Sequence, residues 1–242
     1  MKKLAPLLLL APLALGSCGL FNRAPKPVTT AGGTLMDAKV TYDASGNATT
    51  TYTAWSGGAG KVTFNMLDNT TQAPVKTGET TLSADGKFSF ASLPTPKDSD
   101  LTGFENSGTP SECTGKIEIS DMAVRGASPL LLTDATADVI VAPMNVTGTT
   151  DAAATLFYVD RNAKLSGKET CTYSNPTSTY ITEYNVSLVK GWNWVTLKIT
   201  QDKTTRTFSV TNGIAANLKW AQRIETAQPM SLPTLGRPFT LR

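Results

Sequence analysis

The stretch YNVSLVKGWNWVTLKIT, residues 184–200, decides the fold class. Apolar residues alternate with polar ones over 184–188 and again over 195–199, and Lys190-Gly191 stands between the two runs. A period of two is typical of strands that bury one face, and a glycine between two such runs favours a turn. The pattern predicts two antiparallel strands, and Thr207–Val210, after a turn at 201–203, extends them to a three-stranded meander.

The same alternation recurs on both sides of this stretch. Residues 61–66 place Val62, Phe64 and Met66 on one face, and residues 116–119 alternate cleanly. Residues 149–159 (TTDAAATLFYV) are compatible with a helix by propensity, but the β-branched and aromatic residues at their end favour a strand. Turn residues at 43–47, 84–87 and 160–162 predict hairpins, so we expect an all-β protein with antiparallel sheets.

Residues 86–94 (GKFSFASLP) place Phe88 and Phe90 on one face of a short strand that ends in Leu-Pro. This stretch resembles the closing strand of carboxypeptidase-regulatory-like, or transthyretin-like, β-sandwich modules. The resemblance covers nine residues, implies a sandwich rather than a barrel, and transfers no functional residue. We therefore expect antiparallel β-sandwiches, as two packed immunoglobulin- or transthyretin-like units at 35–128 and 129–242.

The N-terminus has the pattern of a secretory signal peptide, residues 1–17. Two lysines precede an apolar run from Leu4 to Leu15, and the small residues Gly16 and Ser17 follow. As a helix this run spans about 18 Å, which is less than the roughly 30 Å of a bilayer's hydrocarbon core. The run is therefore too short for a permanent transmembrane anchor.

Leu15-Gly16-Ser17-Cys18 resembles the lipobox of bacterial lipoproteins. The resemblance implies cleavage before Cys18, attachment of diacylglycerol to its thiol, and acylation (typically with palmitate) of the new amine. The alternative is an ordinary secretory signal with a cysteine by chance. Two or three acyl chains hold a protein on a membrane almost permanently, since each buried methylene contributes roughly 0.8 kcal/mol. Residues 18–34, rich in Pro, Gly and Thr, would then form a lipidated tether.

Charge gives no sign of a nucleic-acid partner. Cleavage removes two of the 22 basic residues and none of the 19 acidic ones, which leaves a side-chain balance of +1. No run of basic residues is present. Aspartate after the lipidated cysteine favours inner-membrane retention in this class, and Gly19 in that position favours the outer membrane where a cell has two. The expected location is the cell envelope.

Cys113 and Cys171 form an even pair in a chain with export signals, so a disulfide is the expected state. Two free buried thiols are an alternative. A metal site is disfavoured, because the chain contains no histidine to complete the ligands.

The absence of histidine also excludes Ser-His-Asp and Cys-His catalysis. Paired carboxylates remain available, and Asp98, Asp100 and Glu105 are close together in a polar stretch. Such residues are more often solvated turn residues, so no catalytic residue and no cofactor is predicted.

Trp192 and Trp194 share one face of a strand, opposite to Val195, and Asn193 would then point inward. An open face would display both rings for stacking on sugars or a partner. The alternative, buried tryptophans, is common in β-sandwiches. The leading hypothesis is a lipid-anchored, non-enzymatic module that binds or scaffolds another envelope protein. A carbohydrate- or cell-wall-binding module that uses Trp192 and Trp194, and a carboxylate-type envelope hydrolase, are the alternatives.

Overall fold

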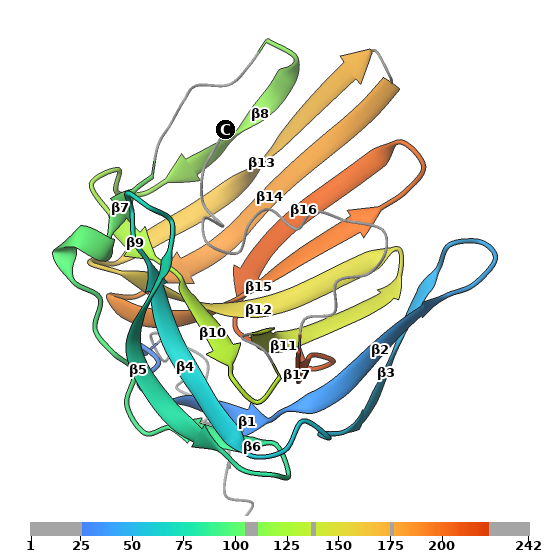
Figure 1. The fold of residues 1–242 in the computed structure, drawn as a ribbon. Coiled ribbons are helices and arrows are strands. Elements are labelled where there is room, and N and C mark those ends of the chain that lie inside the picture. Colours follow the sequence, from blue (N-terminus) through green and yellow to red (C-terminus); the bar gives the residue numbers. More distant parts are fainter. Residues whose placement is uncertain (1–25, 105–110, 137–138, 175–176, 223–242) are drawn as a thin grey trace, which may run out of the picture.

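Strands joined by turns and loops make up most of the fold (Figure 1). The structure, a computed structural model, describes residues 26–104, 111–136, 139–174 and 177–222. The predicted signal peptide 1–17, Cys18, the first part of the tether and Glu105 lie outside these residues. The all-β fold with multiple antiparallel sheets, of sandwich type, is confirmed.

The first half of the chain supplies eight strands and one short 3₁₀ helix. They are β1 (Ala31–Thr34), β2 (Met36–Tyr42), β3 (Ala48–Ala54), β4 (Gly60–Leu67), β5 (Pro74–Leu82), β6 (Lys87–Phe90), η1 (Asp98–Asp100), β7 (Thr102–Gly103) and β8 (Cys113–Ile119).

The second half supplies longer strands. They are β9 (Arg125–Ala127), β10 (Pro129–Thr133), β11 (Val139–Gly148), β12 (Thr150–Val159), β13 (Ala163–Ser174), β14 (Thr177–Leu188), β15 (Gly191–Gln201), β16 (Thr205–Asn212) and β17 (Lys219–Gln222).

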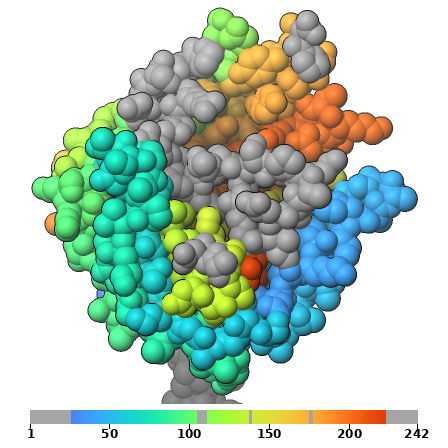
Figure 2. Space-filling view, in the orientation of Figure 1, coloured from blue at the N-terminus to red at the C-terminus, as the bar shows by residue number. Residues whose placement is uncertain are grey.

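One hydrogen-bonded path runs through most of these strands, in the order β17-β2-β3-β11-β12-β15-β16-β14-β13-β8. β10, β4 and β5 branch from β11, while β1 and β6 form a separate two-stranded sheet. In Figure 1 the path curves strongly, with β8, β13 and β14 at one end of the molecule and β1 and β6 at the other. The hairpin of β2 and β3 stands out from the body of the molecule, as Figure 2 shows in blue.

β12 and β15 lie in the middle of the molecule with a core on each face. Leu156 and Trp192 pack into one cluster with Phe64 of β4. The opposite face of the same two strands, with Phe157 and Val195, packs into a second cluster against β13, β14 and β16. Burial on both faces explains why residues 149–159 lack a clear alternation. Their prediction as a strand is confirmed.

Two strand pairings predicted in the second half of the chain are wrong. The turn at 160–162 joins β12 to β13, and the turn at 189–190 joins β14 to β15, yet neither pair of strands is hydrogen-bonded. β16 lies between β15 and β14 and pairs parallel with β14. The physical reason is that each connection carries the chain across the second core, between the β12–β15 ribbon and the β13–β14 ribbon, rather than to an adjacent strand.

The predicted boundary between residues 128 and 129 does not divide the strand network. β2 pairs with β17, β3 with β11, β4 with β10, β8 with β13 and β9 with β12, so five strands that lie before this boundary bond to strands that lie after it. The described strands therefore join the two predicted units, 35–128 and 129–242, into one hydrogen-bonded arrangement. The expectation of two packed immunoglobulin- or transthyretin-like units stays a prediction, since these pairings show only that strands on both sides of the predicted boundary are hydrogen-bonded to one another.

At β6 the predicted burial and the predicted turn are correct, but the predicted strand pairing is wrong. Phe88 and Phe90 are both buried on one face of β6, as predicted. The turn before them is present, with Gly86 N–H donating to the carbonyl of Ser83, but β6 pairs with β1 rather than with β5. Over the described residues, no helix has the length and apolarity that a membrane crossing requires.

Candidate functional site

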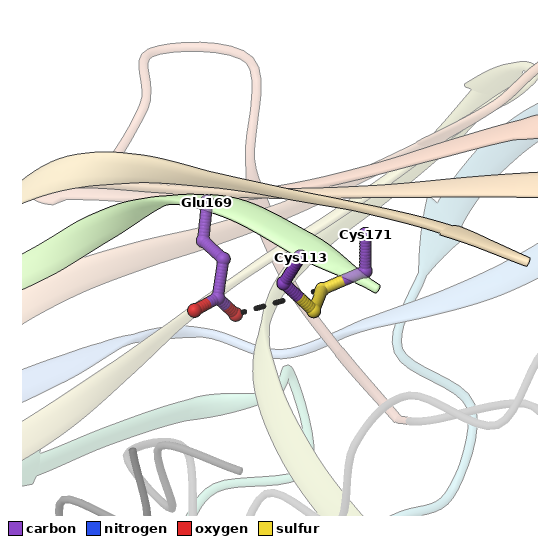
Figure 3. Close-up of side chains that lie close together, drawn as sticks. All are labelled: Cys113, Glu169 and Cys171. Carbon is purple, nitrogen blue, oxygen red and sulfur yellow. Dashed lines mark hydrogen bonds between the residues drawn. A yellow bond between two sulfur atoms is a disulfide. The ribbon is translucent and has the colours of Figure 1, made fainter. Parts of the chain in front are cut away.

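The end of β8, β13 and β14 that lies away from the apolar cores carries a disulfide, a carboxylate and two exposed tyrosines. Cys113 of β8 and Cys171 of β13 lie directly opposite each other in the strand ladder, and their sulfurs are bonded at 2.00 Å. The predicted disulfide is thereby confirmed. It fastens β8 to β13 at the end of the strands where neither contributes to the apolar cores (Figure 3).

Glu169 lies beside the disulfide, two residues before Cys171 and on the same face of β13 (Figure 3). Its Oε1 is 3.7 Å from Cys171 Sγ. A disulfide sulfur carries no proton, so this is a close approach and not a true hydrogen bond. The two sulfurs and the carboxylate lie within 4.8 Å of one another. Thiolates, however, are the ligand form of cysteine, and with both sulfurs bonded the cluster offers a metal one carboxylate.

Two tyrosines extend this face beyond the disulfide. Tyr180 of β14 is the direct ladder partner of Cys171, and Tyr173 follows Cys171 by two residues, so their side chains share its face. Their rings pack edge to face with centroids 5.7 Å apart, yet Tyr180 and Tyr173 remain 46% and 41% exposed. Each ring therefore offers an apolar surface and a phenol hydroxyl to a binding partner.

The strands below the tyrosines hold this face in place. β13 and β14 pair over their whole lengths, and on the opposite face the Nζ of Lys168 lies 2.8 Å from a carboxylate oxygen of Glu183. Tyr184, on the same face as Tyr180, is buried in the second core. Burial, with the negative charge of Glu169, raises the pKa of the Tyr184 phenol. The face thus changes from apolar core at Tyr184 to exposed rings at Tyr180 and Tyr173. We call Glu169, Cys171, Tyr173 and Tyr180 the tyrosine face.

The structure places the two predicted binding tryptophans elsewhere. Trp192 is 4% exposed, its Nε1–H donates to the carbonyl of Pro94 at 2.8 Å, and its ring contacts Phe64 edge to face at 5.2 Å. Trp194 is half-buried and packs against Trp220 at 5.9 Å. The hypothesis of an open face that displays both rings is therefore wrong, because β4 and the β1–β6 sheet cover that face. The alternative, burial, is confirmed for Trp192.

The acidic residues noted in the polar stretch have structural partners. Asp98 accepts a hydrogen bond from Arg125 Nη2 at 3.1 Å, and Asp100 accepts one from the backbone N–H of Lys97 at 2.7 Å. Both belong to the short helix η1. The first contact links η1 to β9 and the second closes the N-terminal turn of η1, which are roles expected of solvated turn residues.

Sequence reasoning missed Tyr173 and Tyr180. The available signal was their position on either side of Asn175-Pro176, a turn dipeptide, next to a cysteine. Comparison with family models, curated proteins and solved structures found no match for this chain.

Proposed function

We propose that the protein is a lipid-anchored, non-enzymatic binding module of the cell envelope. Cys18 attaches it to the membrane, and the tyrosine face binds another envelope component. The anchor rests on the sequence Leu15-Gly16-Ser17-Cys18 at the end of a signal peptide. Gly19 favours the outer membrane in a cell that has two.

The observation that carries the binding role is the exposed Tyr173–Tyr180 pair beside the disulfide. Aromatic rings that are large, amphipathic and low in conformational freedom dominate protein interfaces. Here the disulfide and the β13–β14 ladder position the rings before any partner arrives, which reduces the entropy lost on binding. The absence of histidine and the structural roles of Asp98 and Asp100 support a role in binding rather than in catalysis.

A cell-wall glycan is a second candidate for the bound component. Sugars present apolar C–H faces that stack on aromatic rings and hydroxyls that donate to carboxylates, and Glu169 lies on the same face of the β13–β14 ladder as Tyr173 and Tyr180. This version of the glycan hypothesis uses the tyrosines in place of Trp192 and Trp194.

The anchor is tested by substituting Cys18→Ala in the full chain. We expect loss of labelled palmitate and release from the membrane fraction. Cys171→Ala is the matched control, because it removes a cysteine that carries no lipid and is expected to keep the label. Palmitate on the Cys18→Ala protein would refute the anchor.

The binding role is tested by cross-linking and recovery of the native protein with its neighbours. The double substitution Tyr173→Ala and Tyr180→Ala is expected to abolish recovery of the partner, while Tyr42→Ala, which changes another exposed tyrosine on β2, leaves it unchanged. Retention on isolated cell wall, lost in the same double variant, identifies a glycan instead of a protein. Full recovery of both by the double variant would refute the tyrosine face as the site.

A further inference from the structure

β8 presents an open edge to its surroundings. Among the described residues it pairs with β13 alone, so it ends the long strand path. The backbone N–H of Ser120 donates to the carbonyl of Lys164, and the N–H of Thr172 donates to the carbonyl of Glu112. In an antiparallel ladder, bonded residues alternate with residues whose backbone groups point away. The N–H and C=O groups of Ile117 and Ile119 therefore point outward from the sheet edge.

A groove of about 590 Å³ lies over the outer face of β8 and β13, beside this edge. It is lined by Lys116–Ser120 together with Met122, Lys164 and Ser166. Met122 is an apolar side chain exposed to about half its surface. A further strand added at this edge would form hydrogen bonds with these outward backbone groups.

The charged side chains on β8 indicate which strand would pair with this edge. Lys116 and Glu118 lie on its outer face, 73% and 61% exposed at their side chains, and form an ion pair with each other. We propose that the occupant is β8 of a second copy of this chain, paired antiparallel about a two-fold axis at Ile117. This inference rests on the edge of β8 and does not depend on the lipid anchor or the tyrosine face.

This register satisfies both the backbone and the charges. Ile117 lies opposite Ile117 of the second copy, and the outward backbone groups of the two residues bond to each other. Lys116 then lies opposite Glu118 of the second copy, and Glu118 opposite its Lys116. These are non-hydrogen-bonded positions, where cross-strand side chains approach most closely.

The neighbouring registers are disfavoured by the same charges. A shift by two residues in one direction places Lys116 opposite Lys116, and a shift in the other places Glu118 opposite Glu118. Like charges directly opposite each other destabilise a strand pair. The two side chains therefore select one register from these three.

The test is a charge-exchange series on the full chain, measured by sedimentation equilibrium in density-matched detergent. We expect a reversible dimer for the unaltered protein. Lys116→Glu alone, or Glu118→Lys alone, creates two like-charge pairs and is expected to raise the dissociation constant about tenfold or more. The double variant restores opposite pairs and is expected to dimerise again.

Mixing the two single variants gives a sharper result. Each is expected to be largely monomeric alone, while an equimolar mixture forms a heterodimer. The reason is that the Lys116→Glu chain carries acidic side chains at both positions, and these face the two basic side chains of the Glu118→Lys chain.

Lys168→Glu is the control, since it makes the same charge change on β13, away from the edge. Lys116→Glu loses the exposed ion pair with Glu118 but places opposite charges together with its ladder partner Lys168, so the unfolding temperature is expected to change little.

Three results would overturn the proposal. The first is a monomer at all concentrations for the unaltered protein. The second is a dimer that neither single substitution weakens. The third is a failure to restore the dimer both in the double variant and in the mixture of single variants.

Discussion

Substitution of Asn193 by alanine tests how the turn between β14 and β15 is held. The Asn193 side chain is buried and accepts a hydrogen bond from the N–H of Val189 at 3.0 Å. Its amide donates to the carbonyls of Val189 at 2.8 Å and Gly191 at 2.9 Å. Asn193→Ala leaves these three half-buried backbone groups without this partner. At about 1 kcal/mol for each group, the low end of the usual range, we expect the free energy of unfolding to fall by about 3 kcal/mol.

The assay is equilibrium unfolding in urea with the disulfide intact. With an m-value of about 2 kcal/mol/M, the midpoint should fall by about 1.5 M. Asn212→Ala is the matched control, because Asn212 accepts from the N–H of Ser187 at 2.8 Å and donates to its carbonyl at 2.9 Å at an exposed position. Water replaces these bonds, so the control should lose less than about 1 kcal/mol. Equal losses in the two variants would refute the argument that burial makes Asn193 important.

Three further predictions concern the disulfide, the core and the pH response. Replacing Cys113 and Cys171 together by serine should cost about 4 kcal/mol in the chain-entropy model, for a sequence separation of 58, and intact mass should show two hydrogens gained on reduction. No mass change would refute the bond. Trp192→Ala should lower the free energy of unfolding by about 3–5 kcal/mol, and half-buried Trp194→Ala by less, in the same urea assay. Equal losses would contradict the assigned burial. Hydrogen bonds from two lysines lower the pKa of Glu79 from 4.5 to about 2. The stabilisation from this carboxylate is present above pH 4.5 and is lost as the pH falls through 2, so Glu79→Gln should flatten the stability profile over that range. An unchanged profile would contradict the ion pairing.

Strands could be predicted because the alternation of apolar and polar residues that indicates a strand lies within the residues of that strand. Val62, Phe64 and Met66 are all buried in the first core, on the face that their alternation indicated. The cysteine pair was also predictable, since export signals and an even number of remaining thiols favour a disulfide. In both cases the deciding information is local, or is a property of the whole composition.

The order of strands in the sheet could not be predicted in the same way. Asp160-Arg161-Asn162 has the composition of a hairpin turn, and a turn of this kind is compatible both with an adjacent strand and with a crossing between layers. Because both faces of β12 are packed, the chain crosses to another layer after this turn. That packing depends on β4, which is far away in the sequence. Tyr173 and Tyr180 were missed for a similar reason, since their pairing follows from the β13–β14 register.

Trp192 and Trp194 illustrate why polarity patterns mislead in a central strand. Asn193 separates them and lies on the opposite face with Val195, so an inward Asn193 and an open tryptophan face were expected. Asn193 is buried as expected, and its side chain bonds to the turn at 189–191 and so satisfies its own polar atoms. Trp192 on the other face is buried as well, because the first core covers it. The pattern predicted the strand correctly, but the exposure of its two faces followed from hydrogen bonds and covering strands that no local pattern contains.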